Sequence, residues 1–259
     1  MLVFIKTVLV CVVNGEPLVP PLCIFGDSVV DVGNNNNLRT LIKANFPPYG
    51  RDFITHIPTG RFCNGKLTTD FTSEYLGFTS YLHAYHSQKA KGKNILTGAN
   101  FASAASGYYD RTAQLYRAVT LTQQLEYERE WQIKVVNLVR KVRVNAIFSG
   151  EIHLISARSS DFIQNYYINP FLNGAYSHYQ FSDILMKSHS TIVQSFSERE
   201  WIWTSTFISS QNLYRLGARR IGVTTLPPTG CLPAAITLFG SGRNQCVARL
   251  KLDAISFNN

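Results

Sequence analysis

A continuous apolar run at residues 22–25, Leu-Cys-Ile-Phe, constrains the fold more than any other feature of the chain. A strand that helices cover on both faces has no polar side, whereas a half-exposed strand alternates apolar and polar residues. The run ends at Gly26-Asp27-Ser28. It therefore predicts a strand of a parallel sheet that is buried between two layers of helices.

Further along the chain, short apolar stretches alternate with helical patterns, which is typical of a three-layer α/β/α fold around a parallel sheet. With 259 residues the chain is long enough for one such domain, expected over residues 18–259. One stretch, residues 188–206, has no clean period and is expected to be an atypical insertion. Strands are expected over residues 94–101, 152–156 and 220–224. Helices are expected over residues 67–76, 121–142 and 247–257, and a further helix is expected to end at Gly217. A capping box at Thr120 marks the start of the helix over 121–142.

Polar or small residues follow three of these strands. Ser28 follows the first strand, Gly107 ends the small-sided segment 102–107 after the second, and Ser160 follows the third. Because the carboxyl ends of parallel strands meet at one edge, these residues are expected to converge in one crevice. A tight turn would expose the Ser28 hydroxyl, and the amino end of a following helix would offer N–H groups to an oxyanion. Gly-Asp-Ser alone is weak evidence, because a plain turn or a helix cap is the commoner role of such a tripeptide. The small side chains of 102–107 predict a poor packing surface, and the asparagines 34–37 predict a turn.

The chain carries a formal charge of +9, from 25 Lys and Arg against 16 Asp and Glu. Its basic residues are scattered and form no dense run with interleaved aromatic residues. The pattern therefore favours solvated faces over a nucleic-acid-binding surface, and no nucleic acid partner is expected. The excess charge would help docking to an acidic surface such as a polyanionic matrix or a membrane.

The amino terminus has the pattern of a secretory signal, so we expect residues 1–15 to be a signal peptide and the protein to be secreted. The alternative is a buried first strand, which the following Glu16-Pro17 disfavours. The apolar run is too short to span a bilayer, so no stable membrane anchor is expected. Cys231 and Cys246 lie in one loop-rich segment and could pair in an oxidising compartment. Their spacing matches no zinc pattern.

The residues around Ser28 resemble the first block of the plant GDSL esterase/lipases, which belong to the SGNH hydrolase superfamily. The block reads IFGDSVVDVGNNN over residues 24–36. Further stretches are similar to the same family and occur in the same order, which makes the match specific. They are PPYG at 47–50, GRFCNGK at 60–66, GANFAS at 98–103, SSDF at 159–162 and TGCLP at 229–233.

The resemblance implies an SGNH-hydrolase-like fold and hydrolysis of carboxylic esters or lipids, small or polymeric, without metal or cofactor. Ser28 matches the catalytic nucleophile. Its backbone N–H and that of Gly107 match two oxyanion-hole donors, and Ser160 stands where many members have the third donor, an asparagine. Arg158 replaces a glycine of that motif. It is expected to resist the backbone geometry that glycine permits and to place a charge beside the site.

The last block of the family, Asp-x-x-His, supplies the general base and the carboxylate that orients it. The sequence contains no Asp-x-x-His, so no catalytic histidine or aspartate is found in this chain. His153 is expected to be a core residue, and His178 and His189 surface residues. The chain stops at Asn259, in a helix-like segment that relatives continue, so we expect a domain incomplete at its carboxyl terminus. Two functions stay open: a serine hydrolase acting through Ser28, or a secreted non-catalytic protein that binds esters or glycans.

Overall fold

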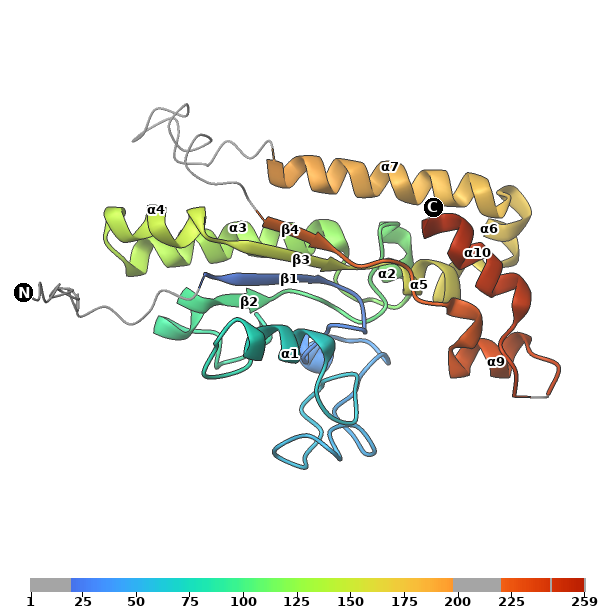
Figure 1. The fold of residues 1–259 in the computed structure, drawn as a ribbon, viewed down its shortest axis with the longest axis horizontal. Helices are drawn as coiled ribbons and strands as arrows, with labels where there is room; N and C mark the ends of the chain where they lie inside the picture. Colours follow the sequence, from blue (N-terminus) through green and yellow to red (C-terminus); the bar gives the residue numbers. More distant parts are fainter. Residues whose placement is uncertain (1–19, 198–219, 243, 259) are drawn as a thin grey trace, which may run out of the picture.

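The computed structural model describes residues 20–197, 220–242 and 244–258. Within them, four parallel strands form one sheet in the order β2-β1-β3-β4. The strands are β1 (Leu22–Gly26), β2 (Gly98–Asn100), β3 (Ile152–Ser156) and β4 (Arg220–Val223). Helices lie on both sides of this sheet (Figure 1). The expected α/β architecture with a parallel sheet is confirmed.

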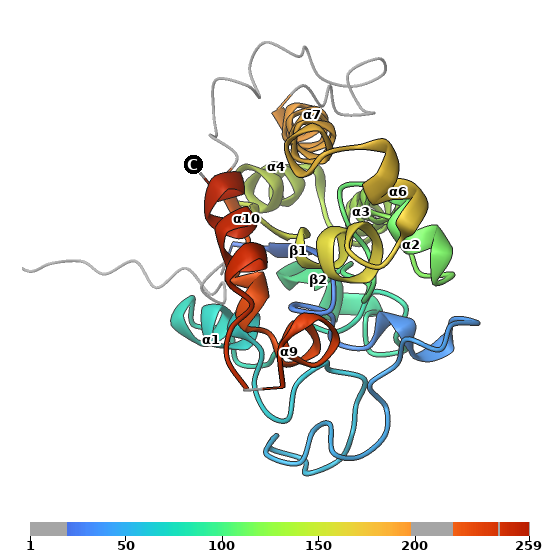
Figure 2. The ribbon, with the colours of Figure 1, turned by 90° about the vertical axis from the view of Figure 1, so that its right-hand side faces the viewer.

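The helices are distributed over the two faces of the sheet and its carboxyl edge. The helices α3 (Leu121–Leu138), α4 (Lys141–Ser149) and α7 (His178–Ser197) lie on one side, and α1 (Thr68–Tyr75) lies on the other (Figures 1 and 2). Beyond the carboxyl ends of the strands lie α2 (Asp110–Leu115), α5 (Ser159–Asp161), α6 (Pro170–Ala175), α9 (Pro233–Phe239) and α10 (Ala248–Asn258). In the part of the chain that the structure describes, no helix combines the length and the apolar character needed to cross a membrane.

Burial of β1 explains its sequence. Its residues Leu22, Cys23, Ile24 and Phe25 are at most 1% exposed. Cys23 and Phe25 belong to the larger core cluster, which includes Trp131 of α3. Leu22 and Ile24 belong to a smaller cluster on the opposite face. The prediction of a strand covered on both faces is confirmed.

The long helix expected over residues 121–142 is divided in two. Its capping box is confirmed: the Thr120 side chain accepts a hydrogen bond from the Gln123 N–H, and the Gln123 side chain accepts one from the Thr120 N–H. The backbone then becomes extended at residues 139–140, between α3 and α4. This break lets α4 turn back, so that Phe148 packs edge-on against Trp131. The apolar pattern runs through the break, which is why the sequence does not reveal it.

The helix α1 is confirmed, but its buried side is polar. Leu67, which precedes it, is buried, whereas Phe71 and Tyr75 are 56% and 92% exposed. Asp70 is buried instead, where its carboxylate accepts hydrogen bonds from the Leu67 N–H and from the Arg61 guanidinium at 3.1 Å. A buried carboxylate needs such partners, because burying it without them would be costly.

The strand expected over residues 94–101 is much shorter than predicted. Only Gly98–Asn100 pairs with β1, and Gly92–Thr97 forms a 3-10 helix, η2. Trp131 accounts for part of this, because its indole N–H donates to the Ile95 carbonyl at 2.8 Å. That contact holds the segment against α3 and away from the sheet.

The expected irregular insertion at residues 188–206 is helical in its first half. The helix α7 continues to Ser197, and Phe181, Leu185 and Ile192 line its buried side. Polar residues between these positions conceal the helical period in the sequence. Residues 198–206, the helix expected before Gly217 and the expected signal peptide at residues 1–15 lie outside the described residues.

A disulfide joins Cys231 to Cys246, as the sequence suggested. Cys231 ends the 3-10 helix η4 (Thr229–Cys231), and Cys246 lies just before α10. Val247 adds to this junction by donating its N–H to the Gly230 carbonyl at 2.8 Å. The bond therefore fixes α10 beside η4 at the carboxyl edge of the sheet.

Replacing both cysteines, Cys231→Ser with Cys246→Ser, should lower the free energy of unfolding by about 3 kcal/mol, because the closed loop is 15 residues long. Denaturant unfolding in the presence and absence of a reductant measures the effect. The reductant should weaken the parent chain and leave the double variant unchanged. Cys63→Ser, which removes a free thiol, is the control. Equal sensitivity of parent and double variant to the reductant would contradict the assignment.

Candidate functional site

The turn after β1 carries Ser28. Gly26, the last residue of the strand, has a φ of +143°, and a Cβ there would overlap the Ser156 carbonyl of β3. Glycine is therefore needed for the chain to turn this close to its neighbour. Ser28 follows in a turn and is half-buried. The helix that we expected directly after it is absent, since the next helical segment, η1, begins only at Asn34.

Asp27 ties this turn to the one after β3. Its carboxylate is 1% exposed and accepts a hydrogen bond from the Ser159 hydroxyl at 2.6 Å. The backbone N–H groups of Arg158 and Ser160 also donate to it. Burial raises the pKa of Asp27, and these hydrogen bonds act in the opposite direction. The contacts bring Ser28 and Ser160 to the same part of the sheet edge.

Gly107 joins this group through Asp161, the residue after Ser160. A Cβ at Gly107 would overlap the Asp161 carboxylate, which also accepts hydrogen bonds from the Tyr108 N–H at 2.8 Å and the Thr112 hydroxyl at 2.7 Å. Burial raises the pKa of Asp161 to about 7, although these hydrogen bonds act to lower it. The structure thus links the loops that carry all three predicted site residues.

Two backbone N–H groups at this edge bind no acceptor in the part of the chain that the structure describes. Neither the Ser28 N–H nor the Gly107 N–H donates a hydrogen bond to any described residue. Most buried amides are paired within the protein, and an oxyanion hole requires donors that are left over. The arrangement fits the predicted roles of Ser28 and Gly107, which stay predictions, as does that of Ser160.

The asparagines 34–37 are mainly structural. The Asn34 amide donates to the carbonyls of Asn100 and Ala102 at 2.9 and 2.8 Å, and the Asn35 amide donates to the Ala104 carbonyl at 3.0 Å. Both side chains are buried. They donate hydrogen bonds to buried backbone carbonyls that have no partner in the sheet. This need for donors explains why asparagines, and not apolar residues, occupy these positions.

The segment 102–107 is a buried packing surface, contrary to our expectation. Residues 102–106 are 0% exposed. Asp31 accepts a hydrogen bond from the Ala104 N–H at 2.9 Å, and burial raises the pKa of this carboxyl to about 6. Side chains larger than alanine or serine would keep the polar loop 31–35 from reaching this backbone. The small residues are therefore what allows the close contact.

Gln124 of α3 is a site residue that the sequence analysis missed. It is 0% exposed; its Oε1 accepts from the Gly26 N–H at 2.8 Å, and its Nε2 donates to the Gly26 carbonyl and the Ser106 hydroxyl, each at 3.0 Å. Gln124 thus holds the end of β1 in place. The sequence does contain one indication that Gln124 is buried, because this residue lies beside Leu121 and Leu125 on the apolar side of an amphipathic helix.

Arg158 differs from our expectation in one respect. Its φ is −154°, outside the left-handed region, so the backbone here does not require glycine. Its side chain is half-buried, with the guanidinium carbon 5.5 Å from the centroid of the Tyr108 ring and 5.0 Å from that of Phe257. The expected charge beside the site is present, whereas the expected backbone strain is not.

None of the six histidines of the chain forms a hydrogen bond with Ser28 in the described structure. His153 lies in β3 and is 2% exposed, which confirms it as a core residue. His178 and His189, expected at the surface, are half-buried. His189 packs edge-on against Tyr108 because α7 continues through this position, with 5.1 Å between ring centroids.

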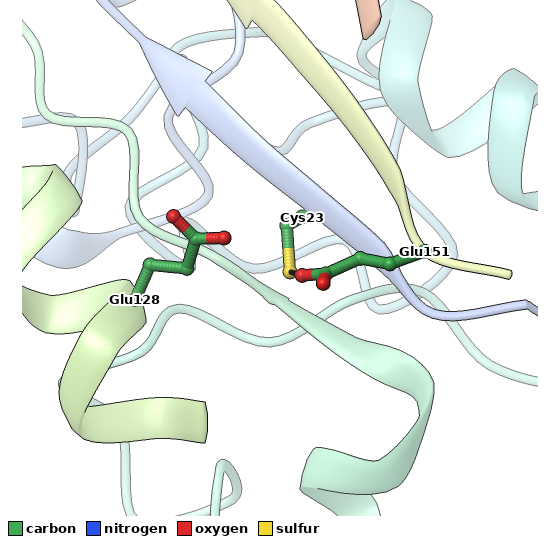
Figure 3. A group of neighbouring side chains, drawn as sticks. All are labelled: Cys23, Glu128 and Glu151. Atoms are coloured by element: carbon green, nitrogen blue, oxygen red, sulfur yellow. Dashed lines mark hydrogen bonds between the residues drawn. The ribbon is translucent and has the colours of Figure 1, made fainter. Parts of the chain in front are cut away.

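A second buried polar cluster lies near the amino ends of β1 and β3. Possible ligand atoms of Cys23, Glu128 and Glu151 lie within 4.8 Å of one another (Figure 3). The Cys23 thiol donates to Glu151 at 3.1 Å, and His153 Nε2 is 2.8 Å from Glu128 Oε1. Burial raises the pKa of the thiol, so it stays protonated.

Comparisons with known proteins agree with these features. A family model described as GDSL-like Lipase/Acylhydrolase matches residues 22–259. Among Arabidopsis thaliana proteins, GDSL esterase/lipase At5g03820 is 63% identical over 247 residues, and GDSL esterase/lipase At5g22810 is 57% identical over 262 residues. These matches cover 95% and 100% of this chain but 65% and 68% of the two relatives. The chain thus spans about two thirds of their length.

Gly107→Ala should destabilise the protein by about 3 kcal/mol or more, because its Cβ would displace the Asp161 carboxylate from its donors. Gly174→Ala is the matched control, since a Cβ there meets no atom within 4 Å. Chemical denaturation of both variants measures the difference. A Gly107→Ala protein as stable as Gly174→Ala would show that the Gly107–Asp161 contact is not required.

The raised pKa of Asp161 should make stability fall as the pH rises from about 4 to about 7. In this range the folded carboxyl holds a proton that the unfolded one, with its ordinary pKa of 3.8, has released. Each step upward in pH therefore favours unfolding until the folded group has ionised. Asp161→Asn should flatten this dependence of stability on pH. The control variant Asp183→Asn, which removes an exposed carboxylate, should leave it unchanged. Urea unfolding across the range provides the measurement, and an unchanged slope in Asp161→Asn would contradict the assignment.

Proposed function

The chain belongs to the GDSL-like lipase/acylhydrolase family, and we propose that it hydrolyses carboxylic esters or lipids through an acyl-enzyme on Ser28. The observation that carries this proposal is the geometry of the turn after β1. Ser28 is half-buried at the carboxyl edge of the sheet, and its own backbone N–H and that of Gly107 donate to no described residue. A nucleophile next to unused donors is the arrangement that acyl transfer requires.

The proposed reaction has two steps. The Ser28 hydroxyl attacks the ester carbonyl, and the alcohol leaves with a proton. Water then attacks the acyl-serine and releases the carboxylic acid. In both steps the negative charge on the carbonyl oxygen is held by the N–H groups of Ser28 and Gly107 and by the Ser160 hydroxyl. Each such donor contributes on the order of 10² to 10³ in rate.

A second function is favoured by the surroundings of the Ser28 hydroxyl. A serine needs a base to become a good nucleophile, and no histidine among the described residues is bonded to Ser28. We therefore keep as the alternative a protein that binds esters or glycans in the same crevice without turning them over. For both functions we propose a secreted protein, which agrees with the pattern of residues 1–15 and with the Cys231–Cys246 disulfide.

Hydrolysis of 4-nitrophenyl acetate and butyrate separates the two functions. If Ser28 is the nucleophile, Ser28→Ala should lower kcat/KM by at least about 10³-fold. The control variant Ser80→Ala, at an exposed serine, should leave kcat/KM unchanged. Equal rates in the parent chain and Ser28→Ala would exclude Ser28 as the nucleophile. Ester binding without hydrolysis, in a parent chain with a cooperative melting transition, would favour the non-catalytic alternative.

A further inference from the structure

Three polar atoms near the candidate site are buried and form no well-aligned hydrogen bond with a described residue, although the Arg158 guanidinium lies close enough to the Tyr108 hydroxyl to act on its pKa. They are Arg158 Nε, the Tyr108 hydroxyl oxygen and His189 Nε2. They come from three separate parts of the fold: the residue before α5, the loop after β2, and α7. Leaving one buried polar atom unpaired costs about 1 to 3 kcal/mol, so three in one place are unusual in a native protein.

The three side chains lie against one another. The Arg158 guanidinium carbon is 5.5 Å from the centroid of the Tyr108 ring, and the centroid of the His189 ring is 5.1 Å from the same point. Tyr108 is 3% exposed. Burial raises the pKa of Tyr108 to about 12, although the neighbouring Arg158 acts to lower it, so the hydroxyl stays protonated and can donate. With the guanidinium and an imidazole N–H, the cluster offers three kinds of donor.

The positive charge of Arg158 has no carboxylate partner within 4 Å in the described structure. The two nearby acids are held by other groups. Asp161 accepts from the Tyr108 N–H and from Thr112, and Asp27 accepts from Ser159. A half-buried guanidinium without an opposite charge attracts an anion, and the neighbouring donors would strengthen that attraction.

The cluster borders the residues that we propose to react with the ester. Tyr108 directly follows Gly107, and Arg158 lies two residues before Ser160. The Phe257 ring of α10, 5.0 Å from the guanidinium carbon, adds an apolar surface beside the charge. A ligand with an apolar chain and an anionic end would match these surroundings.

We propose that Arg158, Tyr108 and His189 form a carboxylate-binding subsite that selects esters carrying a free carboxylate, such as monoesters of dicarboxylic acids. A carboxylate fits because the planar guanidinium can donate to both of its oxygens along one edge. The link to catalysis rests on the proposed ester hydrolysis. Binding of the carboxylate does not require turnover, so it can be tested separately.

The test uses the full chain with Ser28→Ala, in which no acyl-enzyme can form, and titrates it with monomethyl adipate and with dimethyl adipate by ligand-observed NMR. The monoester should bind at least about 10-fold more tightly, as expected for charge-assisted hydrogen bonds. Adding Arg158→Met should abolish the difference. Adding Arg249→Met, which removes an exposed arginine that also lies over a tyrosine ring, should preserve it. Tyr108→Phe, which removes only the hydroxyl, should weaken monoester binding several-fold.

Equal affinities for the monoester and the diester would overturn the subsite, as would a preference that survives Arg158→Met. Inorganic phosphate that displaces the monoester more strongly than acetate does would assign the cluster to phosphate and overturn the carboxylate proposal. The subsite and the reaction can fail separately. Monoester binding without any esterase activity would uphold the subsite alone, whereas hydrolysis of neutral esters with no monoester preference would exclude the subsite alone.

Discussion

The carboxyl edge of the sheet depends on pairing polar groups that have left the strand ladders and are shielded from water. Three buried carboxylates, those of Asp27, Asp31 and Asp161, accept backbone or hydroxyl hydrogen bonds from neighbouring loops. Burial raises the pKa of each one, which shows that dehydration opposes their charge. They remain in place because the loops supply the donors that water would otherwise provide. The loops after β1, β2 and β3 are thereby fixed relative to one another.

This pairing also determines which groups are left for chemistry. A donor at this edge that binds no described residue marks a position at which a ligand could bind. The Ser28 and Gly107 amides are two such donors, and the Arg158, Tyr108 and His189 cluster beside them is another. We propose that the first pair binds a developing oxyanion and that the cluster binds a stable anion.

The sequence predicts the parts of the fold that depend on local patterns. The apolar run of β1, the capping box at Thr120 and the pairing of Cys231 with Cys246 are all confirmed. Features that depend on distant partners are not predictable in this way. The break between α3 and α4 depends on packing against Trp131, and the buried role of Gln124 depends on the end of β1. Motif positions predict Ser28, Gly107 and Ser160 as site residues, which stays a prediction, but they do not predict the buried carboxylates that position their loops.

The central claim is that Ser28 is an activated nucleophile, and its reaction with a fluorophosphonate tests this most directly. Intact-mass analysis of the folded chain and of Ser28→Ala, after the same treatment, gives the answer without a choice of substrate. One covalent adduct is expected on the parent chain and none on the variant. A folded parent chain that gains no adduct, or a variant that gains the same one, would contradict it.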